Sequence, residues 1–308
     1  LTLPIDRLPI GRCVVMNAVD KRSVFAIPRG KVVYLGTTDT DYEGRYDDPP
    51  ITVDDAQYLL DAANATFDVE RLGFDDVVGA WAGLRPLLHQ EGKKPSEISR
   101  KDEIMIGPTG LISMAGGKLT TYRKMAERVT AMVVERLQSF GATLPEEMGD
   151  SETTPLSGGE TGDDIEAFVQ RLKARWPRVA PDIVERLVAV YGSNGERMVE
   201  AMANDPQLAR RCSPDSAVTM SEVAYAVREE MAMTLNDFVE RRSRLFLWDP
   251  ANGLNVAVEA ARLMGSLLGW DAARVDAEVD AYRRHVRDVK AFASSATASV
   301  DEVRVAHG

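Results

Sequence analysis

Two adjacent glycines and a lysine stand where an apolar run changes into a helical pattern. Residues 111–115 read as a buried strand, Gly116 and Gly117 stop it, and after Lys118 the apolar residues recur every three or four positions. Unpaired N–H groups at a helix start carry partial positive charge, and glycine lets a ligand approach the backbone closely. The junction therefore predicts a site for an anionic or electron-rich group. The alternative is a turn that needs glycine only for its backbone geometry.

Three cations are expected at the ends of neighbouring β elements, namely Arg85, Arg100 and Lys118. Arg85 ends an apolar run, 77–84, that we predict to be a strand, and Pro86 restricts Arg85 to an extended backbone. Guanidinium groups donate paired charge-assisted hydrogen bonds to phosphate, and an ammonium acts as a compact charge. We therefore predict a pocket for a phosphorylated ligand. The alternative is pairing with surface acids such as Glu91, Glu97 or Asp102.

A histidine and two cysteines complete the reactive side chains of interest. His89 lies in the β-rich part, and an imidazole that titrates near neutrality could act as a base. The alternative is a loop histidine without a role. Cys13 and Cys212 lack the spacing of a disulfide scaffold or a zinc site, so we expect no metal and a reducing compartment. Cys13 is expected to be a small buried residue.

The elements that must position these residues follow from the apolar periodicity. Alternating runs predict an antiparallel meander, a helix capped by Thr52, and a hairpin that leads into a second helix. The strands of the meander are expected at 13–19, 23–27 and 32–38, the first helix from residue 52, the hairpin strands at 103–106 and 111–115, and the second helix from residue 119.

Beyond residue 140 the strand pattern stops. Residues 141–162 are rich in Gly, Pro, Ser, Thr and acids, which is typical of a linker. The periodicity then predicts helices at 165–176, 181–191, 196–203, 221–241, 254–268 and 272–292. We expect three methionines to fill the helical core, namely Met220, Met231 and Met233.

Several blocks, in order along the chain, resemble the flavin-dependent glycerol-3-phosphate dehydrogenases. They are residues 27–30 with 36–42, 81–87, 96–102 and 116–127, and the helical segments 223–232 and 237–242 resemble the carboxy-terminal domain of the same enzymes. One feature of the family is missing, because no Gly-x-Gly-x-x-Gly fingerprint of its amino-terminal half occurs in these 308 residues.

The resemblance implies an α+β fold. It consists of an antiparallel substrate-binding sheet with the last strand and helix of a Rossmann-like FAD domain, followed by an all-α helical domain. The expected boundaries are 1–110 for the substrate-binding part, 111–140 for the final strand and helix of the FAD domain, 141–162 for the linker, 163–293 for the all-α domain and 294–308 for a flexible tail.

The resemblance also implies an activity, the oxidation of sn-glycerol 3-phosphate to dihydroxyacetone phosphate by hydride transfer to FAD, with electrons passed on to a quinone. Arg85, Arg100 and Lys118 would hold the substrate, and Arg85, Arg100 and His89 are the candidate catalytic residues. The flavin contacts would be Gly116, Gly117, Lys118, Leu119 and Thr120. We expect the chain alone to be inactive. A glycerol-3-phosphate oxidase that uses oxygen and a non-catalytic helical interaction module remain as alternatives.

Composition limits the partners. The net charge of −11 argues against nucleic acid, and 44% hydrophobic with 28% charged residues is typical of a globular chain of two domains. No run approaches the roughly 18 apolar residues of a membrane span, so we expect a cytoplasmic protein. A quinone acceptor would imply peripheral contact with a membrane, and the sequence leaves a homodimer open.

Overall fold

A computed structural model describes the chain except for residues 48, 86–101, 145–148, 214–215 and 293–308. The chain divides into two compact units. Unit 1 contains Leu1–Thr38, Asp48–Ala82 and Gly158–Gly308, and unit 2 contains Asp39–Asp47 and Gly83–Ser157. The α+β prediction is confirmed, because strands and helices mix in the first part of the chain, and the elements assigned to the described residues after Ala115 are helices.

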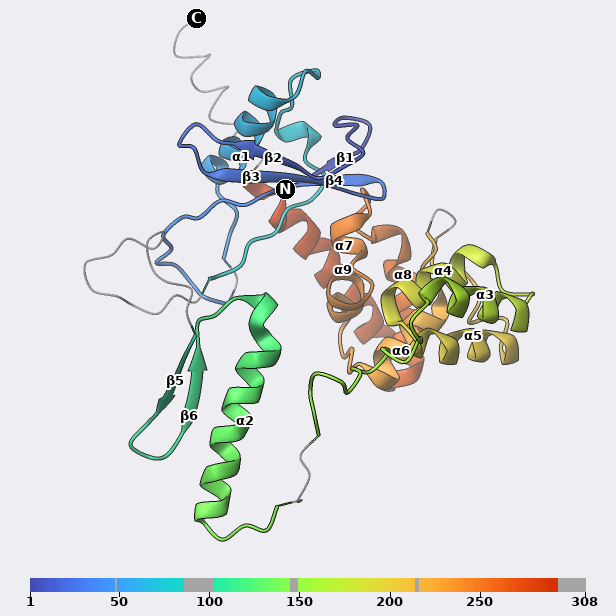
Figure 1. Ribbon diagram of the computed structural model, residues 1–308. Coiled ribbons are helices and arrows are strands. Elements are labelled where there is room, and N and C mark those ends of the chain that lie inside the picture. The colour runs from blue at the N-terminus through green and yellow to red at the C-terminus, as the bar shows by residue number, and fades with distance from the viewer. Residues whose placement is uncertain (48, 86–101, 145–148, 214–215, 293–308) are drawn as a thin grey trace, which may run out of the picture. The chain divides into compact units, whose positions relative to one another are not determined.

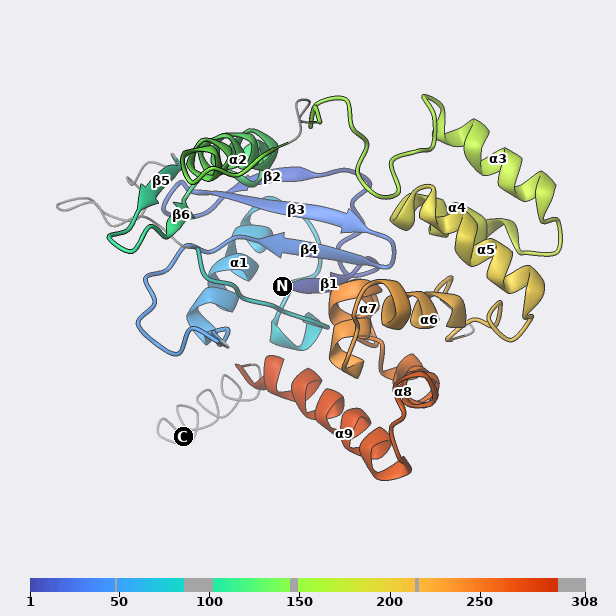
Figure 2. The ribbon, with the colours of Figure 1, turned by 90° about the horizontal axis from the view of Figure 1, so that it is seen from below.

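Unit 1 begins with an antiparallel sheet of four strands in the order β1-β4-β3-β2 (Figure 2). The strands are β1 (Thr2–Pro4), β2 (Val14–Asn17), β3 (Ser23–Arg29) and β4 (Val32–Gly36). The predicted meander is confirmed as β2 to β4. Strand β1 was not predicted, because three residues are too short for a period-two pattern. It adds to the edge of β4, where Thr2 lies opposite Tyr34.

Helix α1 (Val53–Thr66) packs on this sheet. Thr52 caps it as predicted, since the Asp55 backbone N–H donates to the Thr52 hydroxyl over 3.1 Å. Its buried face, which includes Ala56, Leu60 and Ala63, contributes to the core beneath the sheet. The cap and the apolar stripe thus fix where the helix starts and which side it buries.

The predicted strand at 77–84 is wrong. Phe74–Asp76 forms the 3₁₀ turn η1, and after it Gly79 makes an isolated bridge to Thr2 of β1. The Thr2 N–H donates to the Gly79 carbonyl over 2.7 Å, and the Val78 N–H donates to the Thr2 carbonyl over 2.9 Å. Because β1 is only three residues long, it offers little edge for a further strand. Arg85 therefore follows an irregular segment and not a strand end.

Helices are the main elements among the described residues of unit 1 from Gly158 onward (Figure 1). They are α3 (Ile165–Arg175), α4 (Pro181–Tyr191), α5 (Asn194–Asn204), α6 (Met220–Glu229), the π-helix η4 (Asp237–Arg242), α7 (Leu245–Trp248), α8 (Leu254–Leu268) and α9 (Ala272–Val289). Five of the six predicted helices are confirmed within a few residues at each end. We call residues 158–292 of this unit the helical part.

The predicted helix at 221–241 is wrong in its second half. Helix α6 ends at Glu229, and Met231 adopts a left-handed φ of 55° that breaks the helix. A new start follows at Thr234, whose N–H donates to the Asp237 carboxylate while the Asp237 N–H donates to the Thr234 hydroxyl. Met231 and Met233 flank the break and are 78% and 54% exposed, so they do not fill the core as predicted, whereas Met220 does.

Unit 2 contains the hairpin β5 (Glu103–Ile106) and β6 (Ile112–Ala115), the 3₁₀ turn η3 (Leu119–Thr121) and the helix α2 (Tyr122–Ser139). The predicted hairpin and second helix are confirmed. All three apolar core clusters belong to unit 1, and none of the residues described in unit 2 is buried. Of the large apolar residues of α2, Tyr122, Val133 and Leu137 are exposed, and the others are half-buried, such as Met125 and Val129.

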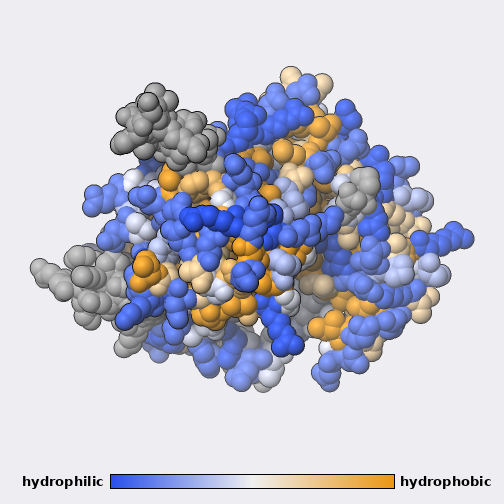
Figure 3. Space-filling model, turned by 90° about the horizontal axis from the view of Figure 1, so that it is seen from above, coloured by the Kyte–Doolittle hydropathy of each residue, from blue (hydrophilic) through white to orange (hydrophobic). Residues whose placement is uncertain are grey.

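No helix in the described ranges is both long and apolar enough to span a bilayer. On the face drawn in Figure 3, apolar side chains lie in small groups among hydrophilic ones.

The two cysteines differ in environment. Cys13 is exposed, so the prediction of a buried residue is wrong, whereas Cys212 is buried and burial raises the pKa of its thiol to about 12. Because the thiolate is the reactive form, we expect Ellman's reagent to modify one thiol rapidly in the native chain and two in denaturant. The variant Cys13→Ser should show no rapid reaction. Two rapid thiols in the native chain would contradict this assignment.

Candidate functional site

The junction between β6 and α2 is a turn that only glycine fits well. Gly116 and Gly117 adopt left-handed φ values of 76° and 86°. A Cβ added to Gly117 would lie 2.5 Å from the Met125 sulfur and 3.2 Å from the Asp102 Cβ. The turn geometry by itself therefore requires glycine, and any ligand role must be argued from the residues that follow.

Backbone donors are available at the start of the helical segment. The Thr121 N–H closes the first turn on the Lys118 carbonyl over 2.9 Å, and the Thr121 hydroxyl donates to the same carbonyl over 2.8 Å. The N–H groups of Leu119 and Thr120 precede this turn and have no acceptor in the described part of the chain. Leu119 is 87% exposed. The helical end thus presents free donors and the positive end of a helix dipole to a ligand.

Among the described residues of this junction, Lys118 is a cation without an ion-pair partner. Other cations of the same stretch already have partners, since Arg123 and Lys124 pair with Glu127 at 3.4 Å and 2.9 Å and Arg128 pairs with Asp102. Within the described residues, no carboxylate lies within ion-pairing distance of Lys118. Its charge is therefore free to meet a bound anion.

Arg85 has a partner that the sequence did not reveal. Its Nη1 lies 2.8 Å from Asp39 Oδ2, and both side chains are about one-third exposed, at 40% and 32%. Of the acids named as alternatives, Asp102 pairs with Arg128 instead, and Glu91 and Glu97 lie outside the described residues. Asp39 belongs to the block 36–42, whose resemblance could have marked it. The fork of Arg85 has five N–H donors, so Asp39 orients it and leaves donors for a second anion.

The remaining predicted residues cannot be placed with these. Arg85 and Lys118 both belong to unit 2, with Gly116, Gly117 and Thr120. Arg100 and His89 lie outside the described residues. Convergence of the three cations on one pocket therefore stays a prediction.

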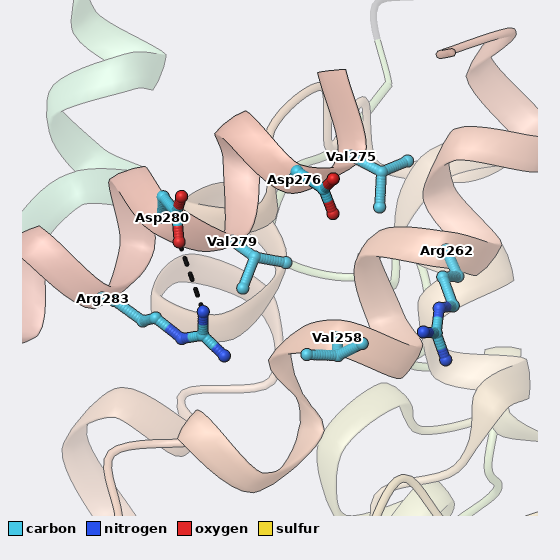
Figure 4. Close-up of a pocket in the computed structure, with 7 residues that line it drawn as sticks. All are labelled: Val258, Arg262, Val275, Asp276, Val279, Asp280 and Arg283. Atoms are coloured by element: carbon cyan, nitrogen blue, oxygen red, sulfur yellow. Dashed lines mark hydrogen bonds and ion pairs between the residues drawn. The ribbon is translucent and has the colours of Figure 1, made fainter. Parts of the chain in front are cut away.

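A hollow between α8 and α9, about 330 Å³ in volume, lies elsewhere in the helical part (Figure 4). Its lining residues are Val258, Arg262, Val275, Asp276, Val279, Asp280 and Arg283. Arg283 pairs with Asp280 over 3.2 Å, and Arg262 pairs with Glu259 over 3.3 Å. Since its two arginines are balanced by acids, this hollow does not suit a phosphate, and it contains none of the predicted site residues.

Comparisons with known proteins place these features in context. Residues 2–123 match a family model described as FAD dependent oxidoreductase, and residues 150–275 match one described as the C-terminal domain of alpha-glycerophosphate oxidase. The aerobic glycerol-3-phosphate dehydrogenase of Staphylococcus aureus strain USA300 is 34% identical over 294 residues, which are 92% of this chain and 51% of that protein. The protein of the same name from strain COL gives the same values.

A solved structure is similar along nearly the whole chain. It is the X-ray structure of the glycerol-3-phosphate dehydrogenase from Bacillus halodurans complexed with FAD, with a TM-score of 0.78 and 30% identity. The match covers 94% of this chain and 56% of that one. The chain therefore spans about half the length of the curated relatives it matches.

Proposed function

This chain is homologous to the FAD-dependent glycerol-3-phosphate dehydrogenases, and from that premise we propose that it forms the substrate-binding and helical parts of such an enzyme. The reaction is the oxidation of sn-glycerol 3-phosphate to dihydroxyacetone phosphate, with FAD as cofactor and a quinone as the final acceptor. The observation that carries the proposal is the junction at Gly116 to Thr120, which lies within a block typical of the family. There Lys118 has no ion-pair partner, and two backbone N–H groups have no acceptor, among the residues that the structure describes.

Lys118 and the start of the helical segment suit the flavin. FAD, when bound, supplies a hydride acceptor whose pyrimidine edge becomes negatively charged on reduction. The ammonium of Lys118 and the N–H groups of Leu119 and Thr120 would stabilise that charge. Gly116 adds no side chain of its own at this point, which leaves the backbone open to the approach of a ring system, whereas the Met125 side chain already lies against Gly117.

Arg85 suits the phosphate of the substrate. Its guanidinium is held by Asp39 over 2.8 Å and is partly exposed, so the remaining donors can form the paired hydrogen bonds that phosphate accepts. We assign Arg100 as a second phosphate ligand and His89 as the base that removes the hydroxyl proton of the substrate. Lys118 would complete the positive charge around the substrate.

Unit 2 suits a role as the closing part of a FAD domain. A two-stranded sheet is marginal on its own, and α2 buries none of its apolar side chains fully and exposes Tyr122, Val133 and Leu137. A larger sheet would cover them, and we infer that this chain alone binds FAD poorly and is inactive. Peripheral contact with a membrane belongs to the same proposal, because a quinone acceptor lies in the bilayer.

The proposal is tested by a protein in which this chain is joined to the remaining half of its relatives' length. Under anaerobic conditions, glycerol 3-phosphate should bleach the visible flavin band, and a soluble quinone should restore it. Rapid reoxidation by oxygen alone would favour the oxidase, for which the family model over residues 150–275 gives some support. A flavin that binds but is never bleached would favour the interaction module.

The variant Lys118→Met should lower the reduction potential of the bound flavin by about 30 mV, because about 1.4 kcal/mol of stabilisation of the reduced form is lost. The potential is measured by equilibration with a reference dye. The matched control is Lys124→Met, whose ammonium already pairs with Glu127 over 2.9 Å and should leave the potential unchanged. Equal shifts in both variants would contradict the assignment of Lys118.

A further inference from the structure

The segment that leads to Arg85 belongs to unit 1 up to Ala82, and contacts hold it at Val78, Gly79 and Trp81. Two backbone hydrogen bonds join Val78 and Gly79 to Thr2 of the edge strand β1. On its other side Gly79 lies against the helical part. A Cβ added at Gly79 would lie 2.6 Å from the Thr2 hydroxyl oxygen and 3.0 Å from Asn252 Nδ2. Glycine is therefore needed here for a close approach of two parts of the fold.

Asn252 cannot easily move away from this contact. It is 1% exposed, and its amide Nδ2 donates to the Phe246 carbonyl over 2.9 Å. The Tyr282 hydroxyl of α9 donates to the Asn252 carbonyl. The loop between α7 and α8 is thereby tied to α7 and to α9, so Gly79 rests on a rigid surface.

Trp81 is held by the helical part in a second way. Its ring lies 6.0 Å from Trp248 of α7, edge to face, and 6.0 Å from Tyr34 of β4. Tyr34 and Trp248 are 5.2 Å apart, and the Arg29 guanidinium lies 5.6 Å from the Trp248 ring. The ribbon views agree that α7 lies next to the sheet at β1 and β4 (Figures 1 and 2). Two rings from two separate elements, β4 and α7, thus hold Trp81.

The helical part has had no role in the proposed chemistry. We propose that Trp248 and Asn252 are positioning residues, which fix the segment Val78 to Ala82 and thereby the start of the loop that carries Arg85. The inference rests on the proposed role of Arg85 in binding the substrate phosphate. Arg85 follows Ala82 by three residues along the chain, so the placement of the segment limits where its guanidinium can reach. Substrate affinity would then depend on a helix that does not touch the substrate.

The test uses the flavin-containing protein described above. Trp248→Ala should raise the KM for glycerol 3-phosphate about tenfold and change kcat less than about twofold, because misplacement affects phosphate binding more than hydride transfer. The dissociation constant of dihydroxyacetone phosphate, followed by the flavin spectrum, should rise by a similar factor. Trp248→Phe should remain near wild type, since the buried indole N–H has no hydrogen-bond partner within the described residues and a phenyl ring keeps the ring contacts.

Two controls separate positioning from general damage. Tyr225→Ala removes an aromatic contact of the helical part, with Tyr191 at 5.5 Å, and should leave KM unchanged. In an Arg85→Ala background, Trp248→Ala should add less than about a twofold effect, because it acts through Arg85. If Trp248→Ala does not fold, Gly79→Ala tests the inference instead. It keeps the aromatic contacts and moves the segment away from Asn252, so it should raise the KM for glycerol 3-phosphate in the same way.

The inference is overturned if wild type is active and neither Trp248→Ala nor Gly79→Ala changes KM. It is also overturned if the effect of Trp248→Ala persists undiminished without Arg85. A wild-type protein that glycerol 3-phosphate does not reduce would instead refute the proposed function, and this inference with it.

Discussion

Replacing Glu222 by alanine should lower the free energy of unfolding of the helical part by about 3–5 kcal/mol, the usual loss when one partner of a buried ion pair is removed. Glu222 is fully buried near the start of α6. Its carboxylate accepts two hydrogen bonds from the Arg186 fork, at 3.1 Å and 3.0 Å, and one from the Tyr191 hydroxyl at 3.1 Å. It also caps its own helix, because it accepts from the Thr219 N–H over 3.2 Å.

The expected loss is large because every partner of Glu222 is itself shielded. The Arg186 side chain is only 24% exposed, so its charge would remain partly buried without a counter-ion. Burial already raises the pKa of Tyr191 well above its usual range, and its hydroxyl would lose its acceptor. One carboxylate thus joins α4 to α6 and starts α6, and its removal affects all three interactions.

Urea unfolding followed by circular dichroism measures this loss. The matched control is Glu185→Ala, also in the helical part, whose carboxylate pairs with Lys173 at 2.5 Å but is 57% exposed; it should cost less than about 1 kcal/mol. The loss of unfolding free energy in Glu222→Gln should lie between those of Glu222→Ala and Glu185→Ala, because the amide oxygen still accepts hydrogen bonds. Similar losses for Glu222→Ala and Glu185→Ala would show that burial of the Arg186 pair contributes nothing.

Local patterns predicted those elements whose signals lie within a few residues. The cap at Thr52 and the stripe of α1 are both readable, and the observed helix starts at the next residue. The break after Glu229 is different, because the left-handed Met231 carries no glycine or proline signal. The new start at Thr234 and Asp237 does have a readable capping box, and the apolar periodicity on both sides concealed it.

Long-range pairing could not be predicted in this way. Strand β1 is defined by its contacts with β4 and Gly79, which lie far away along the chain, as in the pairing of Thr2 with Tyr34 and with Gly79. The apolar run at 77–84 looked like a strand because Trp81 and its neighbours are held by rings from β4 and α7, not by a ladder. Burial against other side chains and burial within a sheet give the same composition.

In the site, too, local features were predicted from the sequence and long-range pairs were not. The sequence located the junction at Gly116 and Gly117, whose geometry is local, and it indicated Lys118 as a cation of the site. In the described residues Lys118 has no ion-pair partner. It did not find Asp39 as the partner of Arg85, because the two are 46 positions apart. Charges can be counted from a sequence, but which acid reaches which arginine depends on the tertiary fold.

The pair of Arg85 with Asp39 bears on the variant Arg85→Ala, which tests the proposed phosphate contact. In the flavin-containing protein, its KM for glycerol 3-phosphate should rise about 100-fold, since the hydrogen bonds of a charged pair contribute about 1.5–3 kcal/mol. Arg85→Lys should recover only part of the lost substrate affinity, because an ammonium keeps the charge but cannot form the paired hydrogen bonds to phosphate. Anaerobic bleaching of the flavin at increasing substrate concentration measures the change.

The matched control is Arg45→Ala. Arg45 also belongs to unit 2 and pairs with an acid, Asp47, at 2.5 Å, but its side chain is 81% exposed. Its removal should leave KM within about twofold, because an exposed ion pair contributes little to stability. A similar rise in both variants would indicate a general loss of positive charge and not a phosphate contact. An unchanged KM in Arg85→Ala would place the phosphate elsewhere and leave the pair with Asp39 a structural contact only.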